Sequence, residues 1–203
     1  MIEGRKIRLR AVEEKDLEFL LKMANDPEIS GLVVGWEFSL SLTDQKMWFS
    51  QSQTDRSNRR FIVEDGNAHP IGLTGLWAID WHDRHALTAL KLSSKETRGK
   101  GYGTDAIMTI MAYAFYEVGL RKLWGEILPY NIASYKAYVG KCGWRVEGLL
   151  RKHVFRKGSF HDLYRVSILK EEFDLLPKAA EYVDLINPVD ITQALQPEDK
   201  DRV

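Results

Sequence analysis

The chain has 203 residues, and 29 lysines and arginines balance 29 aspartates and glutamates. Its hydrophobic residues, 44% of the total, suffice for a packed core and exclude disorder over most of the chain. The formal net charge of +0 argues against a nucleic-acid-binding protein, and the longest uncharged stretch, 66–79, is too short to span a membrane. The single cysteine, Cys142, excludes an internal disulfide. Because no apolar signal segment follows the N-terminus, we expect a cytoplasmic globular protein.

The first part of the chain predicts one strand and two helices. Residues 7–10 alternate apolar and charged side chains, as a half-buried strand does. Apolar residues spaced along one helix face predict a helix over 17–24, which the sequence Asn-Asp-Pro at 25–27 ends. After an irregular segment, 30–42, a second short helix is expected to begin near 43–44.

The middle of the chain predicts an antiparallel meander. Three strand-like runs are separated by turn residues: 61–63, 71–79 and 86–92. Pro70, Gly72 and Gly75 weaken the second of these strands, so we expect it to bend there.

The second half alternates helices and strands. The pattern predicts a helix over 107–118 closed by Gly119, a strand over 123–128, a helix over 133–141 and a hairpin over 144–169. A strand, a helix and a further strand imply one parallel βαβ unit within an otherwise antiparallel sheet, so the fold class is α+β. We expect one domain over 1–176 and a C-terminal tail over 177–203, docked on the surface or disordered.

A loop that leads into the third helix is suited to bind phosphate. Gly99, Gly101 and Gly103 let backbone amides converge without obstruction by Cβ atoms. The opening turn of the helix adds unpaired N–H groups and the positive end of its dipole. Arg98 and Lys100 add positive charge. The segment therefore predicts a phosphate-binding site.

Two kinds of phosphate ligand fit this loop. The spacing Gly101-x-Gly103-x-x-Ala106, with Glu126 about 20 residues further on, matches a dinucleotide-binding fingerprint and suggests a nucleotide-dependent oxidoreductase. Against this, a polar loop separates the glycines from the preceding strand, and Glu126 lies inside its strand. The preceding strands also have antiparallel character. A phosphorylated acyl carrier is the alternative.

Two motifs resemble those of a known family. Residues 98–103, Arg-x-x-Gly-x-Gly, are similar to the acetyl-CoA pyrophosphate loop of the GNAT N-acetyltransferases. Residues 131–138, Asn-x-x-Ser-x-x-x-Tyr, with Gly-Trp at 143–144, resemble the second family motif. The segments 71–76 and 157–162 are similar to strings of the RimJ/RimL-like subgroup, and the resemblance covers about 5–172.

The resemblance implies the fold and the reaction. In this family a mixed, mostly antiparallel sheet is flanked by helices, and its two central parallel strands splay apart to admit the cofactor. The implied enzyme is an N-acetyltransferase that moves the acetyl group of acetyl-CoA directly to a primary amine, without a metal. The implied cofactor-binding residues are Leu90, Lys91, Leu92, Arg98, Gly99, Lys100, Gly101, Tyr102, Gly103, Thr104, Asn131 and Ser134.

The resemblance also implies a general acid, whereas the base stays open. Tyr138 stands at the position of the family's acid, where a phenol can protonate the leaving thiolate. Many relatives carry a glutamate at the position of Leu87. Glu126 is the preferred base, and the alternatives are Asp80, Asp83, His82, His85 or a water chain. The missing carboxylate also allows a GNAT-like module that binds acyl-CoA without turnover.

The acceptor side is less well defined. Trp36, Trp81 and Asp80 are candidates for the acceptor pocket, the first two as aromatic walls and the third as a partner for a cationic amine. The acceptor is a protein N-terminus or a small amine, and the chain is a monomer or a homodimer. One extra residue between Tyr138 and Gly143 predicts a π-bulge or a longer turn.

Overall fold

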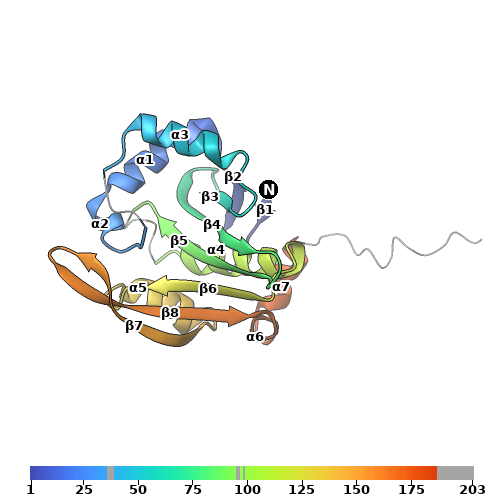
Figure 1. The fold of residues 1–203 in the computed structure, drawn as a ribbon. Helices are drawn as coiled ribbons and strands as arrows, with labels where there is room; N and C mark the ends of the chain where they lie inside the picture. The colour runs from blue at the N-terminus through green and yellow to red at the C-terminus, as the bar shows by residue number, and fades with distance from the viewer. Residues whose placement is uncertain (36–38, 95–96, 98, 187–203) are drawn as a thin grey trace, which may run out of the picture.

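The computed structural model describes residues 1–35, 39–94, 97 and 99–186. Eight strands form one sheet in the order β1-β2-β3-β4-β5-β6-β8-β7 (Figure 1). β5 and β6 pair in parallel, and the other described pairs are antiparallel. A doubly wound nucleotide-binding sheet would need more parallel strands. The strands are β1 (Ile2–Glu3), β2 (Ile7–Ala11), β3 (Arg59–Asp65), β4 (Pro70–Asp80), β5 (His85–Leu92), β6 (Lys122–Ile127), β7 (Arg145–Arg156) and β8 (Ser159–Leu169).

Helices cover both faces of the sheet. One face of β3 and β4 packs on α1, where Leu20, Ile62 and Leu73 form a buried cluster, while α4 lies on the other face within the main core. Figure 1 shows α1 and α3 together on one side of the sheet, away from α4. The helices are η1 (Glu14–Asp16), α1 (Leu17–Asn25), α2 (Pro27–Ser30), α3 (Leu42–Ser52), α4 (Tyr102–Ala112), η3 (Tyr113–Glu117), α5 (Ile132–Tyr135), η4 (Lys136–Lys141), α6 (Lys170–Asp174) and α7 (Ala179–Ile186).

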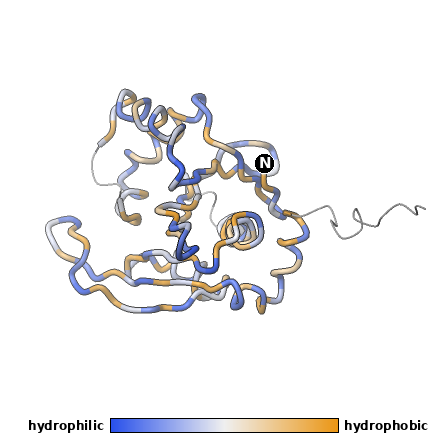
Figure 2. Tube along the Cα trace, turned by 45° about the vertical axis from the view of Figure 1, so that its right-hand side comes forward, coloured by the Kyte–Doolittle hydropathy of each residue, from blue (hydrophilic) through white to orange (hydrophobic). Residues whose placement is uncertain are grey.

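The predicted meander and hairpin are confirmed. β3, β4 and β5 pair in sequence order, and β7 and β8 form a long hairpin that turns at Lys157 and Gly158, both with positive φ. Figure 2 shows hydrophobic and hydrophilic residues alternating along the extended segments at the lower side of the molecule. Such alternation is typical of strands with one buried face.

The expected irregularity in β4 is found at its Pro70 end and not at Gly75. Val63 pairs with Gly72 and Glu64 pairs with Pro70, so one residue of β4 between them is unpaired. Gly75 lies in regular pairing, and a second irregularity falls between Trp77 and Asp80. A Cβ atom on Gly72 would lie 2.4 Å from the carbonyl oxygen of Lys91, and one on Gly75 would lie 2.2 Å from that of Arg59. The glycines therefore allow neighbouring backbones to approach closely.

The parallel pair splays after three residues. Residues 85–87 of β5 pair with 122–124 of β6, and both strands then continue without pairing to each other. Figure 1 shows their C-terminal ends diverging. At the fork, a Cβ atom on Gly125 would lie 3.1 Å from the carbonyl oxygen of Thr88. The expected fold, a mixed sheet with splayed central strands, is thus confirmed.

The extra residue after Tyr138 forms a π-helix. α5 continues into η4, whose end is marked by a hydrogen bond of 3.1 Å from the backbone N–H of Cys142 to the carbonyl of Ala137, five residues earlier. Of the two expected outcomes, the structure shows the π-bulge.

The C-terminal segment begins with a docked helix. Ala179 and Tyr182 of α7 are buried in the main core, and α7 contacts α4, η3 and β1. Residues 187–203 lie outside the described residues, so the domain boundary at 176 stays a prediction. Over the residues that the structure covers, no helix has the length and apolar character needed to cross a membrane.

Candidate active site

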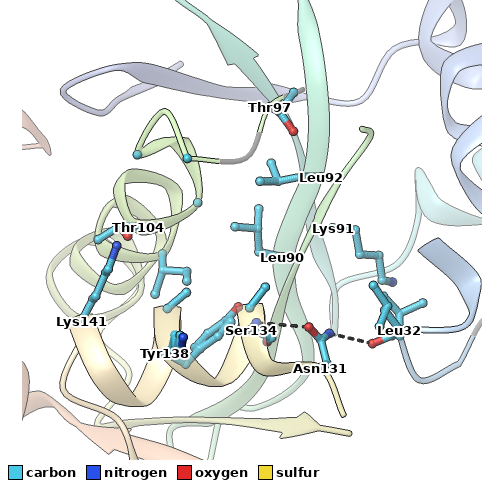
Figure 3. Close-up of a pocket in the computed structure, with 18 of the residues that line it drawn as sticks. Leu32, Leu90, Lys91, Leu92, Thr97, Thr104, Asn131, Ser134, Tyr138 and Lys141 are labelled. Atoms are coloured by element: carbon cyan, nitrogen blue, oxygen red, sulfur yellow. Dashed lines mark hydrogen bonds between the residues drawn. The ribbon is translucent and has the colours of Figure 1, made fainter. Parts of the chain in front are cut away.

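A cavity of about 280 Å³ opens where the central strands diverge. Its walls come from the end of β5, the glycine loop, the start of α4 and the helix formed by α5 and η4 (Figure 3). We call it the cofactor cavity. Of the sequence-predicted residues it is lined by Leu90, Lys91, Leu92, Gly99, Gly101, Gly103, Thr104, Asn131, Ser134 and Tyr138.

The glycine loop ends in an uncapped helix N-terminus. Gly101 is the N-cap of α4 and has a φ of 87°, in the left-handed region that favours glycine. Among the described residues no side chain caps this end, and the N–H groups of the first turn, at 102–104, have no partner within the helix. With the positive end of the helix dipole, they form a site for an anion at the cavity wall.

Alternate residues of β5 face different sides of the sheet. Leu90 and Leu92 point toward α4, whereas Lys91 points toward Leu32 (Figure 3). Burial lowers the pKa of Lys91 to about 8, and the positive charge of Arg60 acts in the same direction. The Lys91 ammonium also lies 5.5 Å from the centre of the Trp77 ring.

Tyr138 projects from η4 into the fork. Its side chain is 6% exposed, and its ring packs edge-to-face against Trp144 at 4.9 Å between centroids. The buried hydroxyl has no hydrogen-bond partner among the described residues. Burial raises the pKa of this phenol and the nearby Cys142 thiol adds to the effect, whereas the close backbone of Leu90 acts in the opposite direction. The group therefore stays protonated at neutral pH and can donate to a ligand atom in the cavity.

Asn131 joins the two sides of the fork. Its side-chain oxygen accepts from the backbone N–H of Ser134 at 3.1 Å and so caps α5, while its nitrogen donates to the carbonyl of Leu32 at 3.0 Å (Figure 3). The Tyr130 hydroxyl donates to the carbonyl of Gly31 at 3.0 Å. These bonds hold the segment 31–34 against the cavities. The side chain of Asn131 is therefore engaged by the protein itself.

A second cavity of about 210 Å³ lies along β5 and β6, and we call it the acceptor cavity. Glu126 lines it and pairs with Arg165 at 3.0 Å. The guanidinium of Arg165 lies 4.2 Å from the centre of the Trp124 ring. Leu87, at the expected carboxylate position, is also in the wall. The apolar side chains that line this cavity are Leu32, Val33, Val34, Leu87, Leu90, Ile127 and Val166.

The two cavities share a boundary at the fork. Tyr138, Lys91 and Leu90 line both. The walls of the cofactor cavity and of the acceptor cavity therefore meet at Tyr138.

The remaining sequence-predicted site residues lie elsewhere. Asp80, the last residue of β4, and Trp81, in the turn that follows, lie outside both linings. The Asp80 carboxylate accepts from the backbone N–H of Asp83 at 2.7 Å, and Trp81 is 53% exposed. Lys100 is exposed in the glycine loop, and Tyr102 packs against the core. Trp36 and Arg98 lie outside the described residues.

Several lining residues were not predicted from sequence. Leu32 and Val33 come from a segment that showed no periodic pattern, and their contact with the site depends on the distant Asn131. Lys136 and Lys141 also line the cofactor cavity. Lys141 could have been identified, because it lies three positions after Tyr138 and one helix face presents residues three and four positions apart. Lys136 lies two positions from both Ser134 and Tyr138, so this spacing gives no such signal.

Comparisons with known proteins agree with this geometry. The model of the acetyltransferase (GNAT) domain matches residues 6–145. The spermidine N(1)-acetyltransferase of Vibrio cholerae is 28% identical over 167 residues, covering 82% of this chain and 95% of the relative. The prophage-derived uncharacterized N-acetyltransferase YokL of Bacillus subtilis is 25% identical over 173 residues, covering 85% and 94%.

A solved structure shows the same architecture. The crystal structure of spermidine N-acetyltransferase from Vibrio cholerae in complex with CoA and spermine matches with a TM-score of 0.77 at 28% identity. The match covers 83% of this chain and 98% of that chain. The chain belongs to the GNAT acetyltransferase family and is an N-acetyltransferase, which moves an acetyl group to an amine.

Proposed function

We propose that the cosubstrate is acetyl-CoA, that transfer to the amine is direct, and that the chain belongs to the RimJ/RimL-like subgroup. The observation that carries the proposal is the unpartnered hydroxyl of Tyr138 at the boundary of the two cavities. A buried polar group without a partner is costly unless a ligand supplies one. The CoA found in the related crystal structure supports the same cosubstrate.

The cofactor cavity offers suitable groups for each part of CoA. The N–H groups of the first α4 turn would hold the pyrophosphate, with Gly99, Gly101 and Gly103 keeping the approach open. Leu90 and Leu92 would flank the pantetheine arm, with backbone hydrogen bonds from the end of β5. Ser134 would contact the same arm from α5. Acetyl-CoA supplies the thioester, whose acetyl group then lies at the fork.

Tyr138 would hold and release the proton that the leaving sulfur needs. Its raised pKa keeps the phenol protonated, as an acid must be before the reaction. A thiol in the same surroundings also has a raised pKa, because burial raises the pKa of the neighbouring Cys142 to about 12. The proton affinity of a buried thiolate is thereby brought closer to that of the phenol. Cys142 itself is fully buried and packs as a small apolar side chain.

Glu126 would accept the proton of the acceptor amine. An alkyl ammonium has a pKa of about 10.4 and cannot attack a thioester until it is deprotonated. Glu126 is the one carboxylate in the described lining of the acceptor cavity. Its side chain is 17% exposed, so a water molecule can complete the path from the amine.

The acceptor is an amine flanked by an apolar group, such as a small hydrophobic amine or a peptide with an apolar first side chain. The described walls of the acceptor cavity are mainly apolar, and Arg165 already pairs with their carboxylate. Lys91 lies in the same wall. The distant ammonium of a polyamine would need a carboxylate of its own, because a buried charge without a partner is unfavourable.

An acetyl-transfer assay tests these assignments. Release of free CoA thiol is measured with acetyl-CoA and each of three amines: phenethylamine, a peptide with N-terminal leucine, and spermidine. We expect a higher kcat/KM for one of the first two than for spermidine. Preference for spermidine would refute the proposed acceptor class but leave the enzyme assignment intact.

Two other outcomes would favour the rival interpretations. CoA binding without thiol release across a wider panel of peptides, polyamines and aminoglycosides would indicate an acyl-CoA-binding module. Binding of a nicotinamide dinucleotide without CoA would indicate the oxidoreductase. A cytoplasmic location and a monomeric or dimeric state stay predictions.

A further inference from the structure

We propose that Asp105 and Tyr182 are positioning residues that hold the pyrophosphate-binding turn of α4 in place from behind. Through them the C-terminal helix α7 sets the affinity for CoA. The inference rests on the proposed function, because it assigns a role to groups that support the proposed cofactor site. It concerns a cluster outside both cavities, formed by the buried carboxylate of Asp105 and the groups around it.

Asp105 lies in the first turn of α4 and is 3% exposed. Its side chain reaches the N-terminal segment that leads into β2, where it accepts from three successive backbone N–H groups. One oxygen accepts from Lys6 at 2.7 Å and Ile7 at 3.0 Å, and the other accepts from Arg5 at 3.2 Å. A carboxylate with this many donors is fixed in orientation, and so is the helix turn that carries it.

A fourth donor comes from the C-terminal helix. The Tyr182 hydroxyl donates to Asp105 Oδ1 at 2.6 Å, within the buried core. Burial raises the pKa of this phenol, and the hydrogen bond to Asp105 raises it further, so the donor stays protonated at neutral pH. An ion pair of 2.6 Å between Arg5 and Glu181 joins the same two segments at the surface.

The N-terminal segment also holds the glycine loop itself. The Lys6 ammonium donates to the carbonyl of Lys100 at 3.0 Å. A Cβ atom on Gly101 would lie 3.2 Å from this nitrogen, and one on Gly4 would lie 2.9 Å from an Asp105 oxygen. The glycine loop and the first turn of α4 are thus packed closely against the N-terminal segment, on the side away from the cofactor cavity.

This arrangement links affinity to a segment beyond the residues that the family model matches. The family model matches residues 6–145, and the related crystal structure is matched over 98% of its own length while 17% of this chain lies outside that match. The α7 helix, at 179–186, lies beyond the family match. Donors that are held in position before binding lose less entropy when the ligand arrives, so loosening the turn should weaken CoA binding.

The test compares two tyrosine variants of the full chain. Tyr182→Phe removes the hydroxyl and keeps the ring. Tyr116→Phe is the matched control, because the Tyr116 hydroxyl also donates to a carboxylate, that of Asp174 at 2.7 Å, but lies outside both cavities and makes no hydrogen bond to Asp105. For each protein the dissociation constant of CoA is measured by calorimetry, and kcat/KM is measured with acetyl-CoA and with S-acetylpantetheine, which lacks the pyrophosphate.

We expect Tyr182→Phe to raise the dissociation constant of CoA about fivefold and to lower kcat/KM for acetyl-CoA by a similar factor. Its kcat/KM for S-acetylpantetheine should match that of the unmodified protein, and Tyr116→Phe should change neither. The inference would be overturned if Tyr182→Phe lowered kcat/KM equally for acetyl-CoA and for S-acetylpantetheine, or if it left the affinity for CoA unchanged. Either result would leave the proposed function standing. Failure of the unmodified protein to bind CoA would overturn the proposed function, and the inference with it.

Discussion

The two cavities that meet at Tyr138 are built in different ways. The cofactor cavity depends on backbone groups: the N–H groups of a helix turn, glycines without Cβ atoms and the end of β5. The acceptor cavity depends on side chains, chiefly Glu126, Lys91 and the apolar residues of a loop and three strands. Backbone groups suit a cosubstrate that a whole family shares, whereas side chains can change from one chain to the next. We therefore expect substitutions in the two cavities to have separable effects.

The largest effect is expected at the shared boundary. Tyr138→Phe should lower kcat about 100-fold, because the proton donor to the leaving sulfur is lost, and should change the affinity for CoA little. Steady-state kinetics with an accepted amine, together with CoA calorimetry, measures both quantities. Tyr135→Phe, on the same helix but outside both linings, is the control. A Tyr138→Phe variant with normal kcat would remove the acid role.

The pH dependence adds a second test of Tyr138. Since burial holds the pKa of its phenol above the ordinary value of 10, kcat should not fall through ionisation of this group between pH 7 and about 10. A loss of activity within this range that Tyr138→Phe abolishes would show that the phenol ionises earlier.

The next effect concerns the acceptor cavity alone. Glu126→Gln should lower kcat/KM for the amine about 30-fold, because the amide cannot take up a proton, while the dissociation constant of CoA should stay unchanged. Glu147→Gln is the matched control, since Glu147 also pairs with a cation, at 2.5 Å from Lys122, but lies outside both cavities. If both substitutions lowered kcat/KM for the amine equally, Glu126 would have a structural role and no role as the base.

A smaller effect is expected in the cofactor cavity alone. Gly101→Ala should raise the dissociation constant of CoA about fivefold, because alanine is strained at a φ of 87° and its Cβ atom would press on the Lys6 ammonium. Gly158→Ala introduces the same kind of strain at a φ of 79° in the hairpin turn, where nothing lies within 4 Å. Calorimetry should show normal CoA affinity in this control. A KM for the amine that rises in Gly101→Ala would contradict the separation of the cavities.

The smallest effect on function is expected outside both cavities. Arg10 on β2 pairs at 2.6 Å with both Asp16 and Glu64, which are 3% and 7% exposed. Asp16→Asn should lower the free energy of unfolding by about 2 kcal/mol at pH 7 and leave kcat and CoA affinity unchanged. Urea unfolding and the two functional assays measure these quantities. A change in CoA affinity would show that this half of the sheet also supports the cofactor.

The pH dependence of this stability loss has a definite sign. Although burial opposes it, the Arg10 guanidinium lowers the pKa of Asp16 below the usual value. In acid the unfolded state therefore binds a proton before the folded state does, and the stabilising contribution is lost as the pH falls below about 4. The unfolding free energies of the two proteins should converge there. A constant difference down to pH 3 would exclude the charged pair as the cause.

Much of the fold could be predicted because its signals are local. The alternation at 7–10, the turn at Lys157 and Gly158, and the extra residue after Tyr138 each predicted a feature that the structure contains. The irregularity at the Pro70 end of β4 was expected, but the reason for Gly72 and Gly75 was not, since each is required by the close approach of a neighbouring strand. Which backbone a glycine faces depends on strand pairing, and pairing is not visible in a single segment.

The site was predictable to the extent that it uses the glycine loop and the helix after Asn131. Leu32 and Val33 could not be identified, because a hydrogen bond from Asn131, almost 100 positions away, brings their segment to the cavity. The contacts of Asp105 could not be predicted from the sequence for a similar reason. A carboxylate near the opening turn of a helix is common on the surface, and only the packed structure shows it buried against residues from both ends of the chain.

The short parallel pairing of β5 with β6 has a consequence for the free protein. Beyond residue 87 the edge of β5 that faces β6 has no neighbouring strand among the described residues, while its other edge stays paired with β4. The main-chain amides that face β6 are therefore expected to exchange readily in the absence of cosubstrate. In the proposed complex, a pantetheine arm along that edge would act as a substitute strand. Slower exchange at those amides of residues 89–92 that face β6 would then report occupancy directly, without any turnover.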